Sequence, residues 1–114
     1  MKGDRLGEFE ELTLLAVCAI KGDVYGVPVQ QFVEKSAGRN ATMGAVYSAL
    51  DRLEDKGYVR SVMGDAEQRP GGKRKRLFEA TPLGMKVVKD LRRVRERIWL
   101  QIDIARQNAA EKKA

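Results

Sequence analysis

Hydrophobic residues in the first part of the chain recur at spacings of three and four, the period that collects side chains on one face of a helix. The pattern predicts a first helix over Leu6–Ile20, ended by the cation and glycine of Lys21-Gly22. From Leu12 onward only Thr13 interrupts the apolar run. A helix that is apolar around its circumference must be covered on more than one side. The inward positions of this helix are Phe9, Leu12, Ala16 and Ile20.

The same spacing predicts two further helices, separated by the helix-breaking residues 38–40. After an extended segment at residues 24–28, the second helix runs from about Pro28 to Ala37. The third runs from about Met43 to Lys56, with Thr42 as its N-cap. The inward residues are Val29, Phe32 and Val33 on the second helix and Val46, Ala49, Leu50 and Leu53 on the third. The opposite face of the third helix carries Gly44, Tyr47, Ser48, Asp51, Arg52 and Asp55.

A change of pattern after Gly57 predicts a β-hairpin. Tyr58–Met63 has strand character, and Lys73–Ala80 has the character of a returning strand. The intervening residues 64–72 contain a proline and several glycines and predict a loop. Because the second strand opens on four consecutive cations, the hairpin has a long basic tip.

A long helix is predicted to follow the hairpin. Thr81-Pro82 provides an N-cap hydroxyl and a proline at the first helical position. The helix runs to about Gln107, roughly 35–40 Å at 1.5 Å per residue. A nearly heptad apolar seam consists of Val87, Leu91, Val94, Ile98, Ile102 and Ala105. Leu100 and Ile104 project from the opposite face, and Trp99 lies off the seam.

The composition excludes most catalytic and metal-binding chemistry. The 114 residues contain no histidine and one cysteine. The chain can therefore form neither a Ser-His-Asp triad nor a zinc site built from His and Cys ligands. It also lacks a P-loop and a dinucleotide-binding glycine motif. We predict a protein that is not an enzyme and that uses no cofactor or metal.

The sequence also bears on where the protein works. No run of about 18 apolar residues is present, so no membrane span is predicted, and the N-terminus does not resemble a signal peptide. The single cysteine, Cys18, cannot form an internal disulfide and is predicted to be a small core residue in the first helix. These features predict a cytoplasmic protein that does not engage a membrane.

The net charge of +6 is unevenly distributed along the chain. Residues 1–38 carry 4 basic and 6 acidic side chains, whereas residues 39–76 and residues 77–114 each carry 9 basic and 5 acidic ones. An excess of this kind is expected for a surface that faces a polyanion, although a basic face can also serve only solubility.

The order of the predicted elements favours a surface that binds a polyanion over one that serves only solubility. Three helices, a basic hairpin and a long helix predict a mostly α-helical fold with a small β-hairpin. The predicted architecture is a winged helix-turn-helix DNA-binding domain over residues 1–81, a C-terminal dimerisation helix over residues 82–107 and a flexible tail over residues 108–114. The major groove of DNA is about 12 Å wide and admits one helix. Here that helix is Met43–Lys56, and the hairpin contacts the neighbouring backbone.

Four segments share the residues and spacings of one known family. They are Leu6–Glu10, Tyr25-Gly26, Gly44–Val59 and Gly71–Gly84. Together they resemble PadR-family transcriptional regulators over about residues 6–88. The resemblance implies a dimeric repressor that binds an inverted-repeat operator through the third helix and the hairpin. It also implies pairing through the first and last helices and, in some members, release of the DNA by a small molecule near the dimer interface.

The residues predicted to contact double-stranded DNA are Arg39, Thr42, Gly44, Tyr47, Ser48 and Arg52 around the third helix and Arg69, Lys73, Arg74 and Arg76 on the hairpin. Tyr47 is singled out because it lies opposite the buried face and its hydroxyl can donate to a phosphate. Other interpretations stay open for this set. Thr42 can be only a cap, Asp51 or Asp55 can pair with Arg52, and a run of cations can protect a sheet edge.

The apolar first and last helices are predicted to form a homodimer, because the last helix is longer than a winged domain needs. The interface residues are Leu12, Leu15, Leu91, Val94, Ile98, Leu100, Ile102 and Ile104. Trp99 either packs in this interface or contacts a small hydrophobic effector, since in some PadR-like drug sensors a tryptophan on this helix stacks on a flat ligand. The alternative function is a protein–protein interaction module that keeps the winged-helix scaffold without reading DNA.

Overall fold

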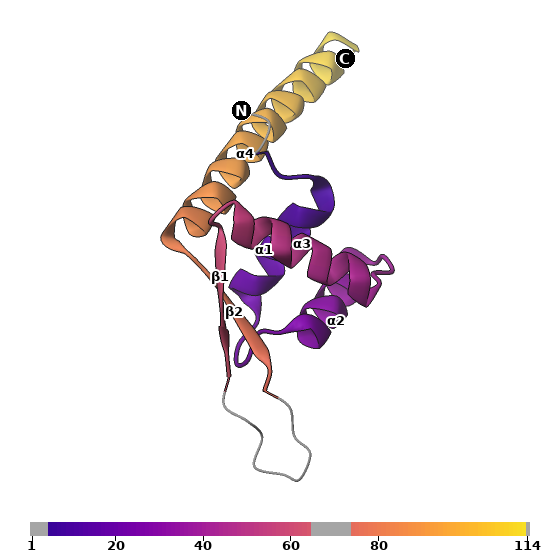
Figure 1. Cartoon of the computed structure of the whole chain (residues 1–114). Helices are drawn as coiled ribbons and strands as arrows, with labels where there is room; N and C mark the ends of the chain where they lie inside the picture. Colours follow the sequence, from indigo (N-terminus) through magenta and orange to yellow (C-terminus); the bar gives the residue numbers. More distant parts are fainter. Residues whose placement is uncertain (1–4, 65–73, 114) are drawn as a thin grey trace.

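The computed structural model describes residues 5–64 and 74–113 and confirms three helices, a hairpin and a long helix in that order (Figure 1). The elements are α1 (Glu8–Ala19), α2 (Gly26–Ala37), α3 (Met43–Asp55), β1 (Val59–Met63), β2 (Arg76–Ala80) and α4 (Pro82–Lys113). The three short helices pack together beside the hairpin, and α4 projects away from them.

One hydrophobic core joins α1, α2, α3 and the hairpin. The four inward residues predicted for α3 are fully buried, and Val29 and Val33 of α2 are buried against them. Val59 of β1 and Phe78 of β2 close the same core from the hairpin side. Because α3 buries one complete face, its opposite face is left exposed in a fixed orientation.

The turn between α2 and α3 is held by side chains of α2. Gly38 ends α2 in the left-handed conformation, with φ of 65°, which favours glycine. The Ala41 amide donates to the Glu34 carboxylate (3.1 Å), and the Gln30 side chain donates to the Ala41 carbonyl (2.7 Å). The hydroxyl of Thr42 accepts from the amide three residues on (3.1 Å), which confirms Thr42 as the N-cap of α3.

The hairpin is antiparallel, with a register that runs from Val59 opposite Ala80 to Met63 opposite Arg76. The Phe78 amide donates to the carbonyl of Val24 (2.9 Å), which ties β2 to the segment between α1 and α2. The position of the hairpin relative to the helices is therefore fixed at the middle of β2.

The start of α4 is docked onto the end of α3. The Thr81 hydroxyl donates to the Gly57 carbonyl (2.6 Å) and accepts from the Gly84 amide (3.0 Å), as an N-cap does. A Cβ on Gly84 would lie 2.1 Å from the Tyr58 carbonyl oxygen, so only glycine permits this contact.

Three helix boundaries differ from the predicted ones by two residues or more. α1 begins at Glu8 rather than Leu6, and α2 begins at Gly26 rather than Pro28. Pro28 fits inside the first turn of α2 because the amide groups there need no helical partner. α4 continues to Lys113 rather than ending at Gln107, so the predicted tail is helical to that residue. Residues 108–113 contain no glycine or proline and are rich in helix-favouring Ala, Glu and Lys.

The buried face of α1 also differs from the prediction. Thr13, Leu14 and Val17 are buried beside Ala16, whereas Phe9, Leu12 and Ile20 are only half-buried. The reason is that α1 is apolar around its circumference, so periodicity does not select one face.

Cys18 is exposed and is not the core residue that was predicted. It lies on the side of α1 that faces α4, where its thiol donates to the sulfur of Met85 (3.4 Å). Partial desolvation of the thiol nevertheless raises the pKa of Cys18, which opposes formation of the reactive thiolate.

Glu10 is a buried carboxylate that joins the start of α1 to the end of α3. Its oxygens accept from the Lys56 ammonium (2.8 and 3.2 Å), the Arg52 guanidinium (3.1 Å) and the Gly7 amide (3.2 Å). Burial by itself raises the pKa of Glu10, but hydrogen bonds from Lys56, Gly7 and Arg52 outweigh it and bring the pKa below its usual value.

We predict that Glu10→Gln lowers the free energy of unfolding at pH 7 by about 2 kcal/mol, because the variant loses hydrogen bonds to charged groups. The pKa of Glu10 is lower in the folded chain than in the unfolded chain. The stability that ionised Glu10 contributes is therefore fully present above the pKa of Glu10 in the unfolded chain. It is lost as the pH falls through the pKa of Glu10 in the folded chain. Urea unfolding of wild type and variant at several pH values measures the difference, which should shrink under acid. A difference that does not change with pH would contradict this assignment.

Candidate nucleic-acid interface

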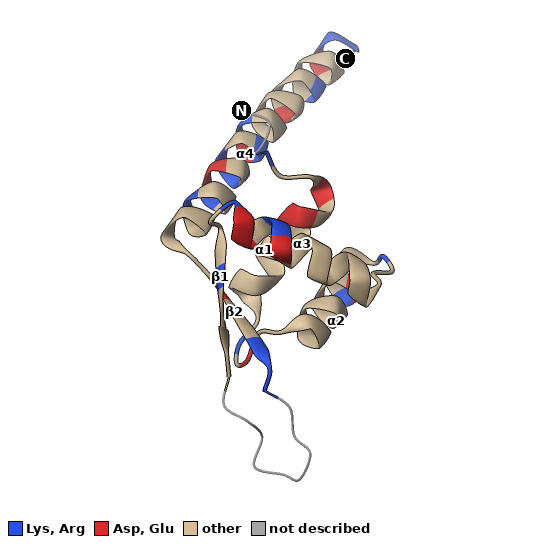
Figure 2. Cartoon of the chain, in the orientation of Figure 1, with Lys and Arg blue, Asp and Glu red and all other residues tan. Residues whose placement is uncertain are grey.

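The exposed face of α3 is the one that the sequence predicts. Gly44, Tyr47 and Ser48 are exposed in its first two turns, directly after the exposed N-cap Thr42. Figure 2 shows that this half of α3 carries no charged side chain, whereas charges gather toward its other end. The start of α3 thus presents hydroxyl groups together with the positive end of the helix dipole, an arrangement that suits a phosphate.

The position of the Tyr47 ring depends on Gly26 of α2, which has no side chain. A Cβ on Gly26 would lie 2.5 Å from both the Cζ and the hydroxyl oxygen of Tyr47, and 2.6 Å from the methyl group of Met43. Glycine at position 26 therefore leaves room for the Tyr47 ring to lie against the first turn of α2. Tyr47 remains 37% exposed in this position.

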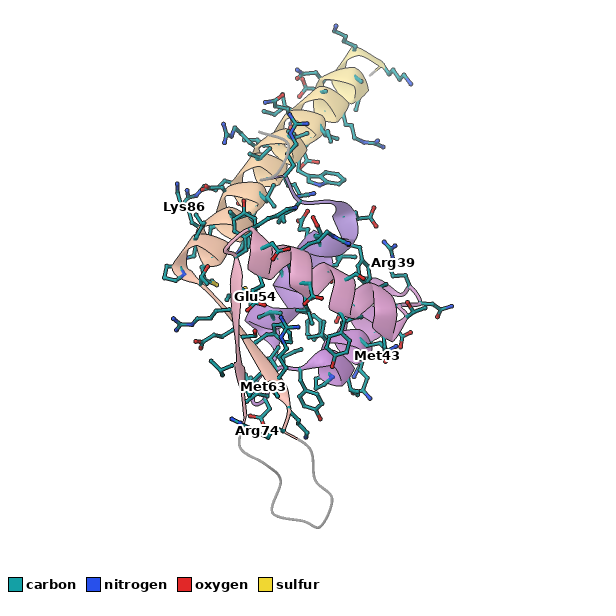
Figure 3. All side chains as sticks on the ribbon, in the orientation of Figure 1. Arg39, Met43, Glu54, Met63, Arg74 and Lys86 are labelled. Carbon is teal, nitrogen blue, oxygen red and sulfur yellow. The ribbon has the colours of Figure 1, made fainter. Side chains whose placement is uncertain are left out.

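Arg74, which Figure 3 labels, and the next residue, Lys75, lie at the loop end of the hairpin, just before β2 begins at Arg76. The Arg74 guanidinium donates to the carbonyl oxygens of Gly64 (2.8 Å) and Met63 (3.3 Å). The Lys75 ammonium lies 4.4 Å from the centroid of the Tyr25 ring, within the range of a cation–π contact. Two further predicted contacts, Arg69 and Lys73, lie outside the described residues.

Tyr25-Gly26 therefore connects the two parts of the candidate interface. Gly26 is in contact with Tyr47 of α3, and the adjacent Tyr25 is in contact with Lys75 at the loop end of the hairpin. The start of α3 and the loop end of the hairpin thus lie on either side of the same dipeptide.

Three of the predicted arginines pair with carboxylates of α1 and α3. Arg39 pairs with Glu8 and lies 5.5 Å from the Phe9 ring centroid. Arg52 pairs with Glu10 (3.1 Å), not with Asp51 or Asp55. The third, Arg76, pairs with two carboxylates of α3, Asp51 (2.8 Å) and Glu54.

Sequence reasoning did not single out Gly26, Glu10 or Glu54 for a role in this interface. An acidic residue three positions after Gly7 is a helix-start signal that could have drawn attention to Glu10. No local spacing relates Glu54 to the hairpin residues that it contacts, because those contacts arise only from the tertiary fold.

The residues predicted for the dimer interface lie on α1 and on the projecting part of α4. Leu15, Val94, Ile98, Leu100, Ile102 and Ile104 are exposed, and Leu12 and Leu91 are half-buried. Trp99 is 61% exposed among them. A single chain therefore presents an apolar surface on α4 that its own core does not cover.

Trp99 lines a surface pocket of about 510 Å³ between α1 and α4, together with Leu15, Met85 and Val88. Ion pairs between Glu11 and Arg95 and between Arg92 and Glu96 border it.

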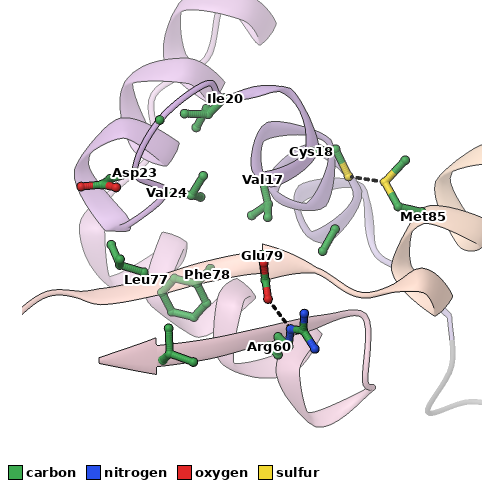
Figure 4. A pocket seen from close by; sticks show the side chains of 13 residues that line it. Val17, Cys18, Ile20, Asp23, Val24, Arg60, Leu77, Phe78, Glu79 and Met85 are labelled. Atoms are coloured by element: carbon green, nitrogen blue, oxygen red, sulfur yellow. Dashed lines mark hydrogen bonds and ion pairs between the residues drawn. The ribbon is translucent and has the colours of Figure 1, made fainter. Parts of the chain in front are cut away.

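A second pocket of about 440 Å³ lies between α1 and the face of the hairpin that points away from α3 (Figure 4). Its lining combines apolar residues such as Ile20 and Leu77 with the ion pair of Arg60 and Glu79.

Within residues 5–64 and 74–113, no group of three or more His, Cys, Asp or Glu side chains could hold a metal ion. In the same ranges, no helix has both the length and the apolar character needed to cross a membrane.

A helix-turn-helix followed by a two-stranded hairpin is the architecture of winged-helix DNA-binding domains, and the exposed α3 is the helix that such domains direct at DNA. Residues 14–90 match the Transcriptional regulator PadR-like family, and the chain belongs to this family.

Solved structures of similar fold are consistent with this assignment. A transcriptional regulator from Clostridium thermocellum is 25% identical, with a TM-score of 0.64 over 82% of this chain and 88% of that chain. A PadR family transcription regulator from Clostridium difficile is also 25% identical, with a TM-score of 0.61 over 85% of this chain and 92% of that chain.

Bacillus subtilis PadR, solved in complex with operator DNA, is 17% identical, with a TM-score of 0.62. The match covers 76% of this chain and 48% of that chain, and at this identity it shows the fold alone. Comparison with curated protein sequences gives no match.

We predict that Gly26→Ala weakens binding to a DNA duplex about tenfold, because the added methyl group displaces Tyr47 and one lost contact costs about 1–3 kcal/mol. Stability should change little, since the atoms that must move are the ends of flexible side chains and alanine favours a helix. Fluorescence anisotropy measures the affinity, and the double variant with Tyr47→Ala should bind no more weakly than Tyr47→Ala alone. Unchanged affinity in both single variants would remove Tyr47 from the interface.

Proposed function

We propose that the chain is a homodimeric repressor that binds a pseudo-palindromic operator in double-stranded DNA through the start of α3 and the hairpin. The observation that carries this proposal is the exposed, hydroxyl-bearing start of α3 opposite four fully buried residues. Members of its family are transcriptional regulators, and the Bacillus subtilis relative was solved with operator DNA. In this proposal the protein acts in the cytoplasm by binding alone, without catalysis.

The contacts divide between the two elements. The start of α3 enters the major groove, where Tyr47 and Ser48 meet phosphates or base edges, and the hydroxyl of Thr42 and the small Gly44 allow close approach. The hairpin follows the backbone with Arg74 and Lys73, and Arg69 is the candidate for entry into a minor groove. Arg39, in the turn that leads into the start of α3, can meet a phosphate by exchanging its ion pair with Glu8.

We predict that wild-type affinity for DNA falls steeply with salt, by about 0.9 units of log K per phosphate contact for each unit of log salt. The triple variant Tyr47→Ala, Lys73→Ala, Arg74→Ala should lose most of this affinity while keeping the circular dichroism of the folded protein. Mobility shifts with promoter and random DNA at low salt test both statements. Full affinity in the triple variant would defeat the assigned surface. Failure of the wild type to bind at micromolar concentration would favour the protein–protein interaction module instead.

The dimer proposal rests on the exposed apolar residues of α4. They project on more than one side of the helix, so a partner that covers them must wrap around it, as a second copy of α4 together with α1 would. Burial of such surface yields about 25 cal/mol per Å².

We predict that the wild type sediments at twice the mass of one chain at micromolar concentration. The variant Ile98→Asp, Leu100→Asp should sediment as a folded monomer, because each buried aspartate would lack a partner. The matched variant Arg97→Asp should remain a dimer. Arg97 is a charged position of α4 between the apolar seam of Val94 and Ile98 and the opposite face of Leu100 and Ile104. A wild type that is monomeric under these conditions would contradict the proposal.

The pocket between α1 and α4 supports a role for Trp99 in effector binding. Its floor is apolar and its border is ion-paired, which suits a small hydrophobic compound with a flat ring. We predict that compounds of this class quench Trp99 fluorescence and release bound DNA, and that Leu15→Arg abolishes both effects. Absence of quenching across a panel of flat apolar compounds would leave Trp99 with a packing role only.

A further inference from the structure

The Arg76 side chain lies between the hairpin and α3. Its Nη1 donates to Asp51 of α3 (2.8 Å), its Nη2 donates to Glu54 of α3, and its Nε donates to the hydroxyl of Ser61 in β1 (3.2 Å). The guanidinium carbon also lies 4.7 Å from the centroid of the buried Phe78 ring. One side chain of β2 is therefore in contact with both strands of the hairpin and with α3.

Glu54 completes the connection from the side of α3. One carboxylate oxygen accepts from Arg76, and the other accepts from the amide (3.0 Å) and the hydroxyl (2.6 Å) of Ser61. The hydrogen bond from Ser61, together with Arg76, brings the pKa of Glu54 below its usual value, and Asp51 and Glu54 raise the pKa of Arg76. Glu54 and Arg76 are therefore both charged in the folded chain.

We propose that Asp51, Glu54, Ser61 and Arg76 form a wing clamp that sets the distance and angle between α3 and the hairpin, and that Arg76 is a positioning residue for DNA binding rather than a phosphate ligand. The proposal deepens the proposed function and rests on it for its DNA-binding consequence. The clamp itself is a property of the protein without DNA.

Geometry and charge support this role. Arg76 already directs three of its five N–H groups, one from each nitrogen, at protein oxygens, two of them on carboxylates. These two carboxylates offset its positive charge through charge-assisted hydrogen bonds, so Arg76 attracts a phosphate less strongly than an unpaired arginine does. A DNA duplex must also meet α3 in one groove and the hairpin beside it, so an error in their relative position weakens both sets of contacts.

The hairpin offers a matched control on its other face. Arg60 of β1 pairs with Glu79 of β2, directly across the ladder, and both side chains are mostly exposed (Figure 4). This pair has the same chemistry and joins the same two strands, but it faces away from α3. Arg60→Ala therefore removes one positive charge from the hairpin without touching the clamp.

The first test needs no DNA. The Ser61 amide donates to Glu54, so its hydrogen exchange reports the closed clamp. We expect exchange of this amide to accelerate at least tenfold in Arg76→Ala and in Glu54→Gln, and to be unchanged in Arg60→Ala. Exchange that is equally slow in all three variants would overturn the clamp, whatever the protein binds.

The second test uses a duplex selected from random DNA by the wild-type protein, with affinity measured by anisotropy over a range of salt. Glu54→Gln removes a negative charge close to the DNA with little change of shape, so simple electrostatics predicts tighter binding, whereas the clamp predicts weaker binding. We expect Arg76→Ala and Glu54→Gln each to weaken binding about tenfold, the double variant to be no weaker than either, and the salt slope to stay unchanged.

The opposite pattern would show that Arg76 is a phosphate ligand. In that case Arg76→Ala would reduce the salt slope by about 0.9, and Glu54→Gln would strengthen binding. If the wild type selects no duplex, the proposed function fails, while the exchange measurement still decides whether the clamp exists.

Discussion

The arrangement of the molecule depends on the burial of one complete face of α3. Four apolar side chains on this helix have no exposure at all, so the helix cannot rotate or slide without opening the core. The N-cap Thr42 fixes where α3 begins, and Lys56, just past its end, is bound to the buried carboxylate of Glu10. The exposed face is consequently presented as a rigid surface, which is what recognition of a DNA groove requires.

A second constraint is that several positive charges form ion pairs within the fold and are not free at the surface. Carboxylates of α1 and α3 hold Arg39, Arg52 and Arg76, so the number of basic residues overstates the charge that is free to meet a polyanion. In the described chain, Arg74 donates to carbonyl oxygens and makes no ion pair with a carboxylate. The same ion pairs connect elements far apart in sequence, and they therefore help to hold the helices and the hairpin in one arrangement.

Sequence periodicity was sufficient to predict the order of the elements, the inward residues of α3, the inward Val29 and Val33 of α2, and the cap at Thr42, because all of these depend on local spacing. Phe32, also predicted to be inward, is only half-buried. It did not predict the orientation of α1, whose apolar residues surround the helix, or the exposure of Cys18. It also did not identify the partners of Arg52 and Arg76, since Glu10 lies 42 residues from Arg52 and Glu54 lies 22 residues from Arg76. Contacts of this range depend on tertiary packing. The roles of the candidate residues in DNA binding and dimerisation stay predictions.

In the proposed complex, two copies of the chain present paired α3 helices to neighbouring turns of one duplex. Sequencing the fragments that the purified protein selects from random DNA tests this arrangement. We expect an inverted repeat whose half-site centres lie about 10 base pairs apart, one turn of the double helix. Enrichment of a single, unrepeated site, or no enrichment at all, would contradict it.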